Sequence, residues 1–581
     1  MTQHDMQLVF LEKLPPGIVL RADGLYHTEV QEDGTPTQTW LCGYLRPTLL
    51  ARRLGKLDWH LQLEFQDMDR QTRTILIPRK QIGTGNHAIA ALLARGFDVH
   101  HDPARRKLLT GVIAQMKPPH RAILTRRLGW QEDGRSYVFV DGSSLGPEDI
   151  IYEGPDRLDD AIRGSLEGWR NGVAQYAPGN PLMVVGLSLA LAAPLVRPLG
   201  VPSGLLHIHG NSSTGKSTAL LCAASVFTSP RHVESWRVTD SALERVAEAH
   251  TGRFLPTDEL GEVDARHFVH ALYMLAHGRG KGRFSLSGSG LAYIAHWELL
   301  GLSTGEISVV EKLLEAGIKA KDGQKARILD IPIEGYKHGI YDELHGHKTG
   351  RGLSDALIAA ANKDHGVAGK AMVAHLLSDI DSVTAQARAE MAAFAALVEA
   401  RRPDAHGGIH GRVRQRFALI AAGGELASAA GITGWPAGTA RAAAYAVYEK
   451  WLNAQGPSPE QKARAEDENR LERLRLFLKA TRNRIRDLDV APPSDTVGVG
   501  PDPVAWLKAG ALHVPAPTWS EIFGDDAEGA AKRLIALGVL EPDRGGDLMR
   551  KLPRQAGQGG RRGYKVLLGP LEQGGGPMGG P

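Results

Sequence analysis

The chain has 581 residues, of which 42 % are hydrophobic and 23 % are charged, and its net charge is +4. Such values are typical of a soluble globular protein, and a chain of this length predicts about three or four domains. The low net charge excludes a uniformly basic nucleic-acid-binding chain, so any such contact must come from local patches. The only cysteines, Cys42 and Cys222, lie far apart. They argue against a disulfide framework or zinc site and indicate a reducing, cytoplasmic setting.

Neither a signal peptide nor a membrane span is expected. Met1–Asp5 is polar. The longest apolar run, Leu182–Val196, is interrupted by Ser188 and Pro194. It is shorter than the roughly 18 to 20 residues that cross a bilayer, so we interpret it as a buried core helix.

Changes of composition along the chain divide it into segments. The N-terminal region contains a few strand-like runs in which apolar and polar residues alternate. After it, apolar strand-like runs take turns with helical runs, and Ala-rich helical runs follow. This order indicates an α/β core followed by a helical region. The predicted boundaries are an accessory domain at 1–150, the core at 151–348, a helical region at 349–455, a charged helix and linker at 456–502, a small unit at 503–570 and a disordered tail at 571–581.

The segment Gly210–Ser217 matches the P-loop pattern G-x-x-x-x-G-K-[ST]. A strand-like run, Leu205–His209, precedes it and a helical run, Thr218–Phe227, follows, which is the setting that the motif requires. In such loops, backbone N–H groups and the helix N-terminus bind phosphates, the lysine reaches the β- and γ-phosphates, and the hydroxyl holds Mg²⁺. The predicted ATP-binding residues are Gly210, Asn211, Ser212, Ser213, Thr214, Gly215, Lys216, Ser217 and Thr218.

An acidic pair follows the next apolar stretch, Arg253–Thr257. We expect Asp258 to hold Mg²⁺, together with Ser217, and Glu259 to polarise the attacking water. Pro256 weakens this reading, because proline removes a hydrogen bond from a strand that should be central.

Two further segments carry candidate residues. A buried strand, Trp297–Thr304, ends in hydroxyls, and either Ser303 or Thr304 is a candidate sensor of the γ-phosphate; Thr304 is preferred. The glycine-rich segment Gly278–Gly290 carries Arg279, Lys281 and Arg283 and suggests a hairpin or flexible loop. Arg327, just before the strand-like Ile328–Pro332, is a candidate finger for a neighbour's ATP site, although a surface ion pair is the commoner role of a single arginine.

Several linked motifs lie in the region from about residue 40 to 455. They are Ser235–Asp240, Asp258–Asp264, Tyr273–Ala276, Gly280–Arg283, Leu302–Ser308, Ala326–Pro332, His406–Gly408, Arg416–Ala427 and Gly431–Trp435. Together they resemble the bacterial family called domain of unknown function 927. Members occur on phages and other mobile elements. Some are similar to self-loading replicative helicases of the minichromosome-maintenance type, which are hexameric AAA+ rings.

This resemblance implies an α/β AAA+ P-loop core with an N-terminal accessory domain, a helical lid and a C-terminal winged helix. It also implies that Lys281 and Arg283, with Arg279 nearby, contact the backbone of DNA, and that Arg412 or Arg416 in the lid is a second sensor of the nucleotide. The order of elements in residues 503–570 suits a winged helix with basic residues at Arg561, Arg562 and Lys565, or a protein-contact module of the same shape.

Three functions fit these features. The first is an ATP-dependent DNA helicase or translocase of a mobile element or phage, which uses ATP and Mg²⁺. It would act on single-stranded or forked DNA as a homo-oligomer, with a hexameric ring expected from the resemblance. The second is an AAA+ switch ATPase, such as an initiator, loader or defence regulator, that does not unwind processively. The third is a phosphotransferase, which Glu259 and an Arg327-type finger disfavour.

Overall fold

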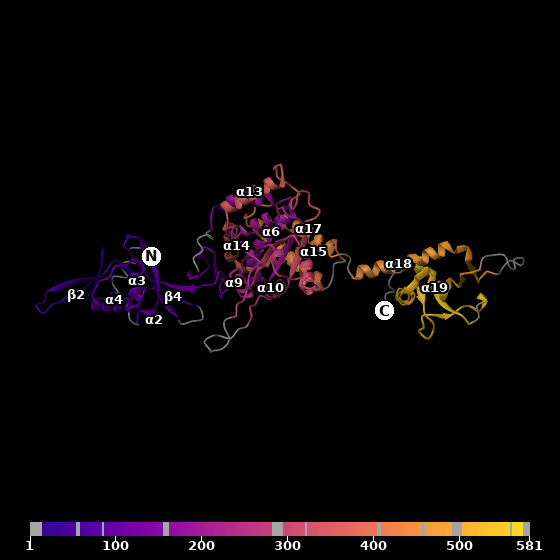
Figure 1. Cartoon of the computed structure of the whole chain (residues 1–581), viewed down its shortest axis with the longest axis horizontal. Helices are drawn as coiled ribbons and strands as arrows, with labels where there is room; N and C mark the ends of the chain where they lie inside the picture. Colours follow the sequence, from indigo (N-terminus) through magenta and orange to yellow (C-terminus); the bar gives the residue numbers. More distant parts are fainter. Residues whose placement is uncertain are drawn as a thin grey trace. The chain divides into compact units, whose positions relative to one another are not determined.

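The structure is a computed structural model that describes residues 14–572 apart from 54–57, 84–85, 155–161, 282–293, 320–321, 404–407, 456–458, 491–501 and 558–559. The chain divides into two compact units, Met1–Ala454 and Gln455–Pro581. Figure 1 traces the helices and strands of both units along the chain.

The first part of unit one is built mainly from antiparallel strands. A three-stranded sheet contains β1 (Ile18–Arg21), β2 (Gly24–Val30) and β3 (Pro36–Cys42). A five-stranded sheet in the order β11-β7-β4-β5-β6 contains β4 (Leu45–Arg53), β5 (Trp59–Gln66), β6 (Thr72–Pro78), β7 (Arg121–Thr125) and β11 (Ile150–Tyr152). The helices here are α2 (Arg79–Ile82), α3 (His87–Leu93) and α4 (Pro103–Gln115).

A small sheet of β8 (Gly129–Trp130), β9 (Tyr137–Val138) and β10 (Ser144–Leu145) follows. Strand β9 ends at Val138 because the chain turns back there, with the Phe139 N–H donating to the Ser143 carbonyl at 2.8 Å.

The centre of unit one is a parallel five-stranded sheet in the order β13-β14-β15-β12-β16. Its strands are β12 (Gly204–His209), β13 (Glu234–Ser235), β14 (Phe254–Asp258), β15 (Leu300–Gly305) and β16 (Ile328–Pro332). The inner strands are almost continuously buried, as expected for a parallel sheet with helices on both faces. β15, which corresponds to the predicted strand Trp297–Thr304 but begins at Leu300, lies between β12 and β14.

The two faces of this sheet enter different cores. Leu206 and Ile208 of β12 pack in a core shared with the helices that follow β16, whereas Leu205 packs in a core shared with the helices between β13 and β15 and after β15. The first group contains α13 (Gly350–Lys363), α14 (Val367–Ser378), α15 (Ile380–Arg401), α16 (Gly408–Ala429) and α17 (Thr439–Ala454), together with α5 (Leu166–Gly172), α6 (Pro181–Ala192), α7 (Val196–Leu199) and α8 (Lys216–Ala224). The second contains α9 (Asp240–Ala249), α10 (Ala265–His277) and α11 (Val309–Glu315); the short α12 (Asp322–Lys325) precedes β16.

The apolar segment Pro181–Leu199 is long and apolar enough to cross a membrane by composition alone, but 83 % of it is buried inside the protein. It contains α6, whose residues Leu182–Ala192 are all buried and pack against α16 and α8. Burial on every side explains a helix without a polar face. The segment is the core helix that the sequence predicts.

Unit two contains a long charged helix and a small sheet. The sheet order is β17-β18-β19-β22-β20, with β21 also paired to β22. Its elements are α18 (Pro459–Ala480), β17 (Ile485–Asp487), β18 (Ala505–Lys508), β19 (Ala511–Pro515), α19 (Ala516–Phe523), α20 (Ala527–Ala536), β20 (Leu540–Glu541), β21 (Arg550–Lys551), β22 (Arg562–Leu567) and α21 (Leu568–Glu572). The core joins Leu474 of α18 to Trp519 and Leu534 of the two following helices. The tail from residue 573 and most of the predicted linker lie outside the described residues.

Candidate active site

The predicted P-loop, Gly210–Ser217, connects the end of β12 to the start of α8. Ser213 and Gly215 have φ angles of 60° and 94°. A Cβ atom at Gly215 would lie 3.1 Å from atoms of Ile340 and Tyr341, so glycine suits both the backbone and the available space. The loop therefore has left-handed turns of the kind found in anion-binding loops, where successive N–H groups point towards one centre.

Lys216 is the first residue of α8 and only 8 % exposed. Its ammonium donates to the carbonyl oxygens of Gly210 at 2.9 Å and Asn211 at 2.6 Å. Burial lowers the pKa of Lys216, and the nearby carboxylates of Glu306 and Asp258 oppose that shift. The ammonium is thus hydrogen-bonded to carbonyl groups of its own loop, close to the place where phosphates bind in such loops.

A cavity of about 1290 Å³ opens beside this loop. We call it the Lys216 cavity. It brings Ser212–Thr218 together with Asp258 and Glu259, which lie about 40 residues further along the chain. The other residues that line it are Gly261, Glu262, Gly305, Glu306, Ile307, Glu315, His338, Gly339, Tyr341, Lys348, Thr349, Gly350, Arg351, Ser354, Asp355 and Ile358.

The hydroxyl of Thr304 donates to the Asp258 carboxylate, so the ends of β15 and β14 are joined at the cavity. Ser303 is fully buried and instead contacts His207 and Trp236 on the other side of the strand. The geometry therefore separates the two hydroxyls: Thr304 faces the acidic pair and Ser303 does not. The preference for Thr304 as sensor stays a prediction, now with a defined contact.

If Thr304 senses the nucleotide through Asp258, Thr304→Val should leave ATP binding nearly unchanged and lower kcat. Valine has the same shape but no hydroxyl. We expect a decrease of roughly 10-fold or more, the scale of one well-placed polar contact. Steady-state ATPase kinetics check this; an unchanged kcat would contradict it. Thr349→Val, at the cavity-lining N-cap of α13, is a matched control.

Glu259 follows β14 with a φ angle of 60°, an uncommon conformation for a residue other than glycine. Its side chain is exposed into the cavity. The negative charge of Glu262, then burial and the charge of Asp258, raise the pKa of Glu259. A carboxylate with a raised pKa is better suited to accept a proton from water than an unperturbed one.

Pro256 does not break the sheet. It pairs with Leu302 of β15, while on the other edge β14 pairs with the two-residue β13 only at Thr257 and Asp258. The proline therefore lies outside that second, short ladder. The missing N–H of Pro256 is therefore compatible with a central strand, which the sequence had put in doubt.

The cavity also contains suitable ligands for Mg²⁺. Ser217 offers a hydroxyl and Asp258 a carboxylate, and hard oxygen ligands, completed by water and phosphate, are what this ion prefers. Among the described residues, no group of three or more His, Cys, Asp or Glu side chains is arranged to hold a metal on its own. The residues thus fit an ion that arrives with a nucleotide.

The sequence did not point to the segment that covers the loop. The Ile340 N–H donates to the Thr214 carbonyl at 2.9 Å, and the Tyr341 hydroxyl lies 2.7 Å from Ser354 Oγ of α13. These contacts bring Lys348 and Arg351, both exposed, to the rim of the cavity. No motif marks these residues. They lie more than 120 positions after the loop, so only the folded chain brings them to it.

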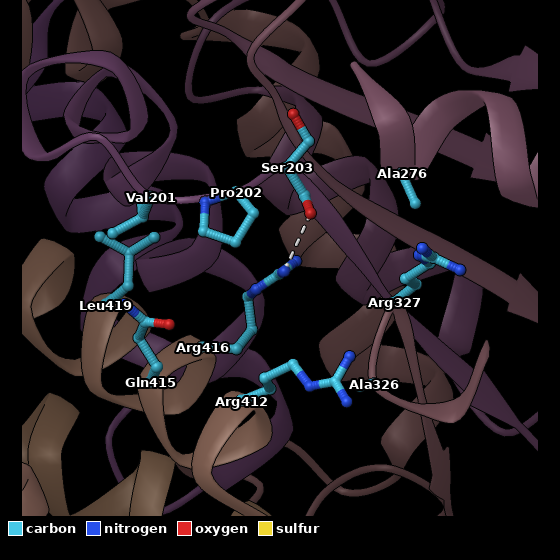
Figure 2. A pocket seen from close by; sticks show the side chains of 10 residues that line it. All are labelled: Val201, Pro202, Ser203, Ala276, Ala326, Arg327, Arg412, Gln415, Arg416 and Leu419. Atoms are coloured by element: carbon cyan, nitrogen blue, oxygen red, sulfur yellow. Dashed lines mark hydrogen bonds between the residues drawn. The ribbon is translucent and has the colours of Figure 1, made fainter. Parts of the chain in front are cut away.

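The three arginines predicted as finger or second sensor do not line the Lys216 cavity. Arg327, Arg412 and Arg416 share a second pocket of about 220 Å³, which we call the arginine pocket. Figure 2 shows their side chains around one hollow, with Arg416 directed at Ser203. Ser203 precedes β12 and the loop follows it, so the six residues of β12, at about 3.3 Å each, place the pocket roughly 20 Å from the loop of the same chain.

Arg416 is 7 % exposed, and its Nη2 donates to the Ser203 carbonyl at 2.9 Å. Its Nη1 has no hydrogen-bond partner among the described residues. Burial lowers the pKa of Arg416 to about 10, so it still carries its charge at neutral pH. None of the ten residues that line the pocket is acidic. A buried cation without a counter-charge is costly, which makes this pocket suited to an anion.

The predicted DNA-contacting residues fall at the end of α10. Arg279 forms a β-bridge with His296, and Arg283 lies outside the described residues, as does most of the predicted loop. Lys281 is exposed, but its ammonium contacts Asp240 and its N–H donates to Glu244 at 3.1 Å. The hydrogen bond from Lys281 lowers the pKa of Asp240. Both acidic residues belong to α9.

In unit two, the basic residues predicted for a wing are partly neutralised. Arg562 pairs with Asp547 at 2.7 Å and Lys565 pairs with Glu541, whereas Arg561 is exposed. Helices α19 and α20 lie in sequence between β19 and β20, and a winged helix remains a prediction.

A family model matches part of the chain. Residues 18–290 match the model described as domain of unknown function (DUF927), which confirms the resemblance over these residues. The resemblance was expected from about 40 to 455; the motifs after residue 290 lie outside the match. No curated protein matches the chain.

The fold as a whole also has a solved counterpart. The structure described as "SCCmec type IV Cch - active helicase" is similar with a TM-score of 0.58 and 16 % identity, over 95 % of this chain and 97 % of that chain. It shows a shared mixed α/β fold. The NrS-1 C terminal region gives a TM-score of only 0.25 at 10 % identity, over 59 % of this chain and 76 % of that chain.

Proposed function

We propose that the protein is an ATP-dependent DNA helicase or translocase of a bacterial mobile element or phage, with an AAA+ core. The observation that carries the proposal is the Lys216 cavity, in which a P-loop lysine, an Mg²⁺-type ligand pair and a water-activating carboxylate meet. The strand order, with β15 between β12 and β14, is the arrangement expected of that class. The fold shared with a protein described as an active helicase supports the direction of the proposal.

Each cavity residue has a chemical task in this proposal. Lys216 leaves the carbonyls of Gly210 and Asn211 for the β- and γ-phosphates, which exchanges two neutral acceptors for a charged one. Ser217 and Asp258 hold Mg²⁺, which supplies positive charge to the transferring phosphoryl group. Glu259 orients and deprotonates water. Arg351 and Lys348 at the cavity rim are candidate cis contacts to the phosphates, a role that Arg412 and Arg416 cannot take from the far edge of the sheet.

The arginine pocket then serves a neighbouring copy. An arginine in such a position, free of acidic neighbours and roughly 20 Å from its own loop, is suited to a phosphate presented by another chain. Arg327, which is half-buried in the lining of this pocket, is the proposed finger. This requires a homo-oligomer in which head-to-tail contacts repeat, and a closed ring, hexameric in the resembling helicases, satisfies it.

Lys281 and Arg279, with Arg283, are the proposed contacts to the DNA backbone. Asp240→Asn should raise affinity for single-stranded DNA by freeing Lys281, and Lys281→Ala should lower it by roughly 3- to 10-fold while reducing the salt slope by about one. Fluorescence anisotropy at several salt concentrations measures both. Equal affinity for all three proteins would contradict the assignment. Lys363→Ala, on the exposed end of α13, is the control.

ATP hydrolysis measured with and without single-stranded DNA tests the function. The proposal expects Mg²⁺-dependent hydrolysis that DNA accelerates. Hydrolysis unaffected by DNA, from a protein that is monomeric in every nucleotide state, would instead favour the switch ATPase.

A further inference from the structure

A chain of hydrogen bonds crosses the interior of the sheet beside the Lys216 cavity. Trp236 Nε1 lies 2.9 Å from Ser303 Oγ, which lies 3.0 Å from His207 Nδ1, and His207 Nε2 lies 2.9 Å from the Ile307 carbonyl. The indole can only donate and the carbonyl can only accept, so the direction is fixed from Trp236 to Ser303 to His207 to Ile307. All three side chains are at most 1 % exposed, and burial lowers the pKa of His207, which favours the neutral ring that this chain needs.

One end of this chain of hydrogen bonds holds residues 303–307, which include the proposed nucleotide sensor Thr304. Ser303 precedes Thr304, whose hydroxyl contacts Asp258, and the Ile307 carbonyl follows Glu306 of the cavity. A Cβ atom at Gly305 would lie 3.0 Å from His207 Cε1, so the imidazole packs directly against this segment. Residues 303–307 are thereby clamped to β12, the strand that leads into the P-loop.

The other end of this chain of hydrogen bonds is Trp236, which lies close in sequence to the helix that holds Lys281. Trp236 comes four residues before α9, whose Asp240 and Glu244 contact Lys281. Its ring also packs edge-to-face on Phe268 of α10, at 5.2 Å and 77°. α10 ends at His277, directly before Gly278 and Arg279. Trp236 therefore contacts Ser303 of β15 and Phe268 of α10, and it lies four residues before α9, whose acidic side chains hold Lys281.

We propose that Trp236 is a positioning residue that couples the nucleotide site to Lys281, so that DNA binding changes the rate of ATP hydrolysis. This rests on the proposed function. When Lys281 leaves Asp240 for a DNA phosphate, α9 is displaced. The displacement is passed to Ser303 through the hydrogen bond from the Trp236 indole, and from Ser303 to Thr304, the next residue in the chain. Fully satisfied buried bonds of this kind hold one arrangement and transmit small shifts between packed elements.

Trp236→Phe tests the coupling, because phenylalanine keeps an aromatic ring but removes the donor. Ser303 still donates to His207, so basal ATP hydrolysis should stay within about twofold, while the acceleration by single-stranded DNA should fall by roughly fivefold or more, a usual size for coupling between sites. Ser303→Ala removes the same bond from the other side and also the bond from Ser303 to His207, so it should lose at least as much of the acceleration and serves if Trp236→Phe does not fold.

Trp169→Phe is the matched control. Trp169 is also fully buried in the first unit and donates to a serine hydroxyl, Ser225 Oγ at 2.9 Å, which in turn donates to the Cys222 carbonyl at 2.6 Å. Among the described residues, no hydrogen bond joins the Trp169 side chain to β15. Full acceleration in Trp236→Phe, or an equal loss in both tryptophan variants, overturns the inference. A wild-type protein that DNA does not accelerate overturns the proposed function itself.

Discussion

Lys216→Ala is expected to abolish ATP hydrolysis, with a decrease in kcat/KM of roughly 10³-fold. Lys216 is the cation closest to the proposed phosphate position, and charged groups that stabilise a transferring phosphoryl group account for effects of this size. The fold should survive, because the hydrogen bonds of the ammonium in the described part of the chain all go to its own loop, to the Gly210 and Asn211 carbonyls and to Thr214. ATPase kinetics and thermal unfolding of the variant measure both effects.

Lys363→Ala provides the control for Lys216→Ala, since Lys363 is exposed at the end of α13 and does not line the cavity. Its kinetics should match those of the wild type. Substantial hydrolysis by Lys216→Ala would show that the Lys216 cavity is not where ATP is hydrolysed.

The second large effect is expected from Arg327. Arg327→Ala should lose roughly 10³-fold in kcat, as removal of an arginine finger does, although the residue lies at the opposite edge of the sheet from its own P-loop. The Arg327 guanidinium lies over the Tyr273 ring at 5.3 Å, a contact whose loss costs little stability. The loss should therefore come from the neighbour's site.

Mixing two inactive variants separates action in trans from action within one chain. An Arg327→Ala chain has an intact cavity, and a Lys216→Ala chain has an intact arginine. In a one-to-one mixture roughly a quarter of head-to-tail interfaces combine both intact parts, so about a quarter of wild-type hydrolysis should return. A mixture as inactive as its components, under conditions in which the chains exchange, would contradict the trans role.

The sequence predicted the parts of the site that are local. β12, the P-loop, β14 and β15 each combine an apolar run with polar residues at the end of a strand, and parallel strands bring such ends to one edge. Burial on both faces gave α6 its unbroken apolar character. The preference for Thr304 over Ser303 had no physical ground in the sequence, because the side of a strand that a residue faces depends on the register.

The rest of the site depends on contacts between distant segments. Nothing near Arg416 indicates that its guanidinium fills the space beside Gly204, where a Cβ atom would lie 1.2 Å from Nη1. Helix α16 packs along α6, and that packing directs Arg416 to the edge of the sheet away from the P-loop. For the same reason Arg351 was missed: the turn at 338–341 carries the start of α13 back over the loop.

Unwinding of a forked DNA duplex by the purified wild-type protein, followed by strand displacement in the presence of ATP and Mg²⁺, tests the central claim most directly. Strand separation that requires ATP hydrolysis and is absent in Lys216→Ala is the predicted result. Hydrolysis of ATP without any strand separation, at a rate that single-stranded DNA does not change, would contradict a helicase or translocase.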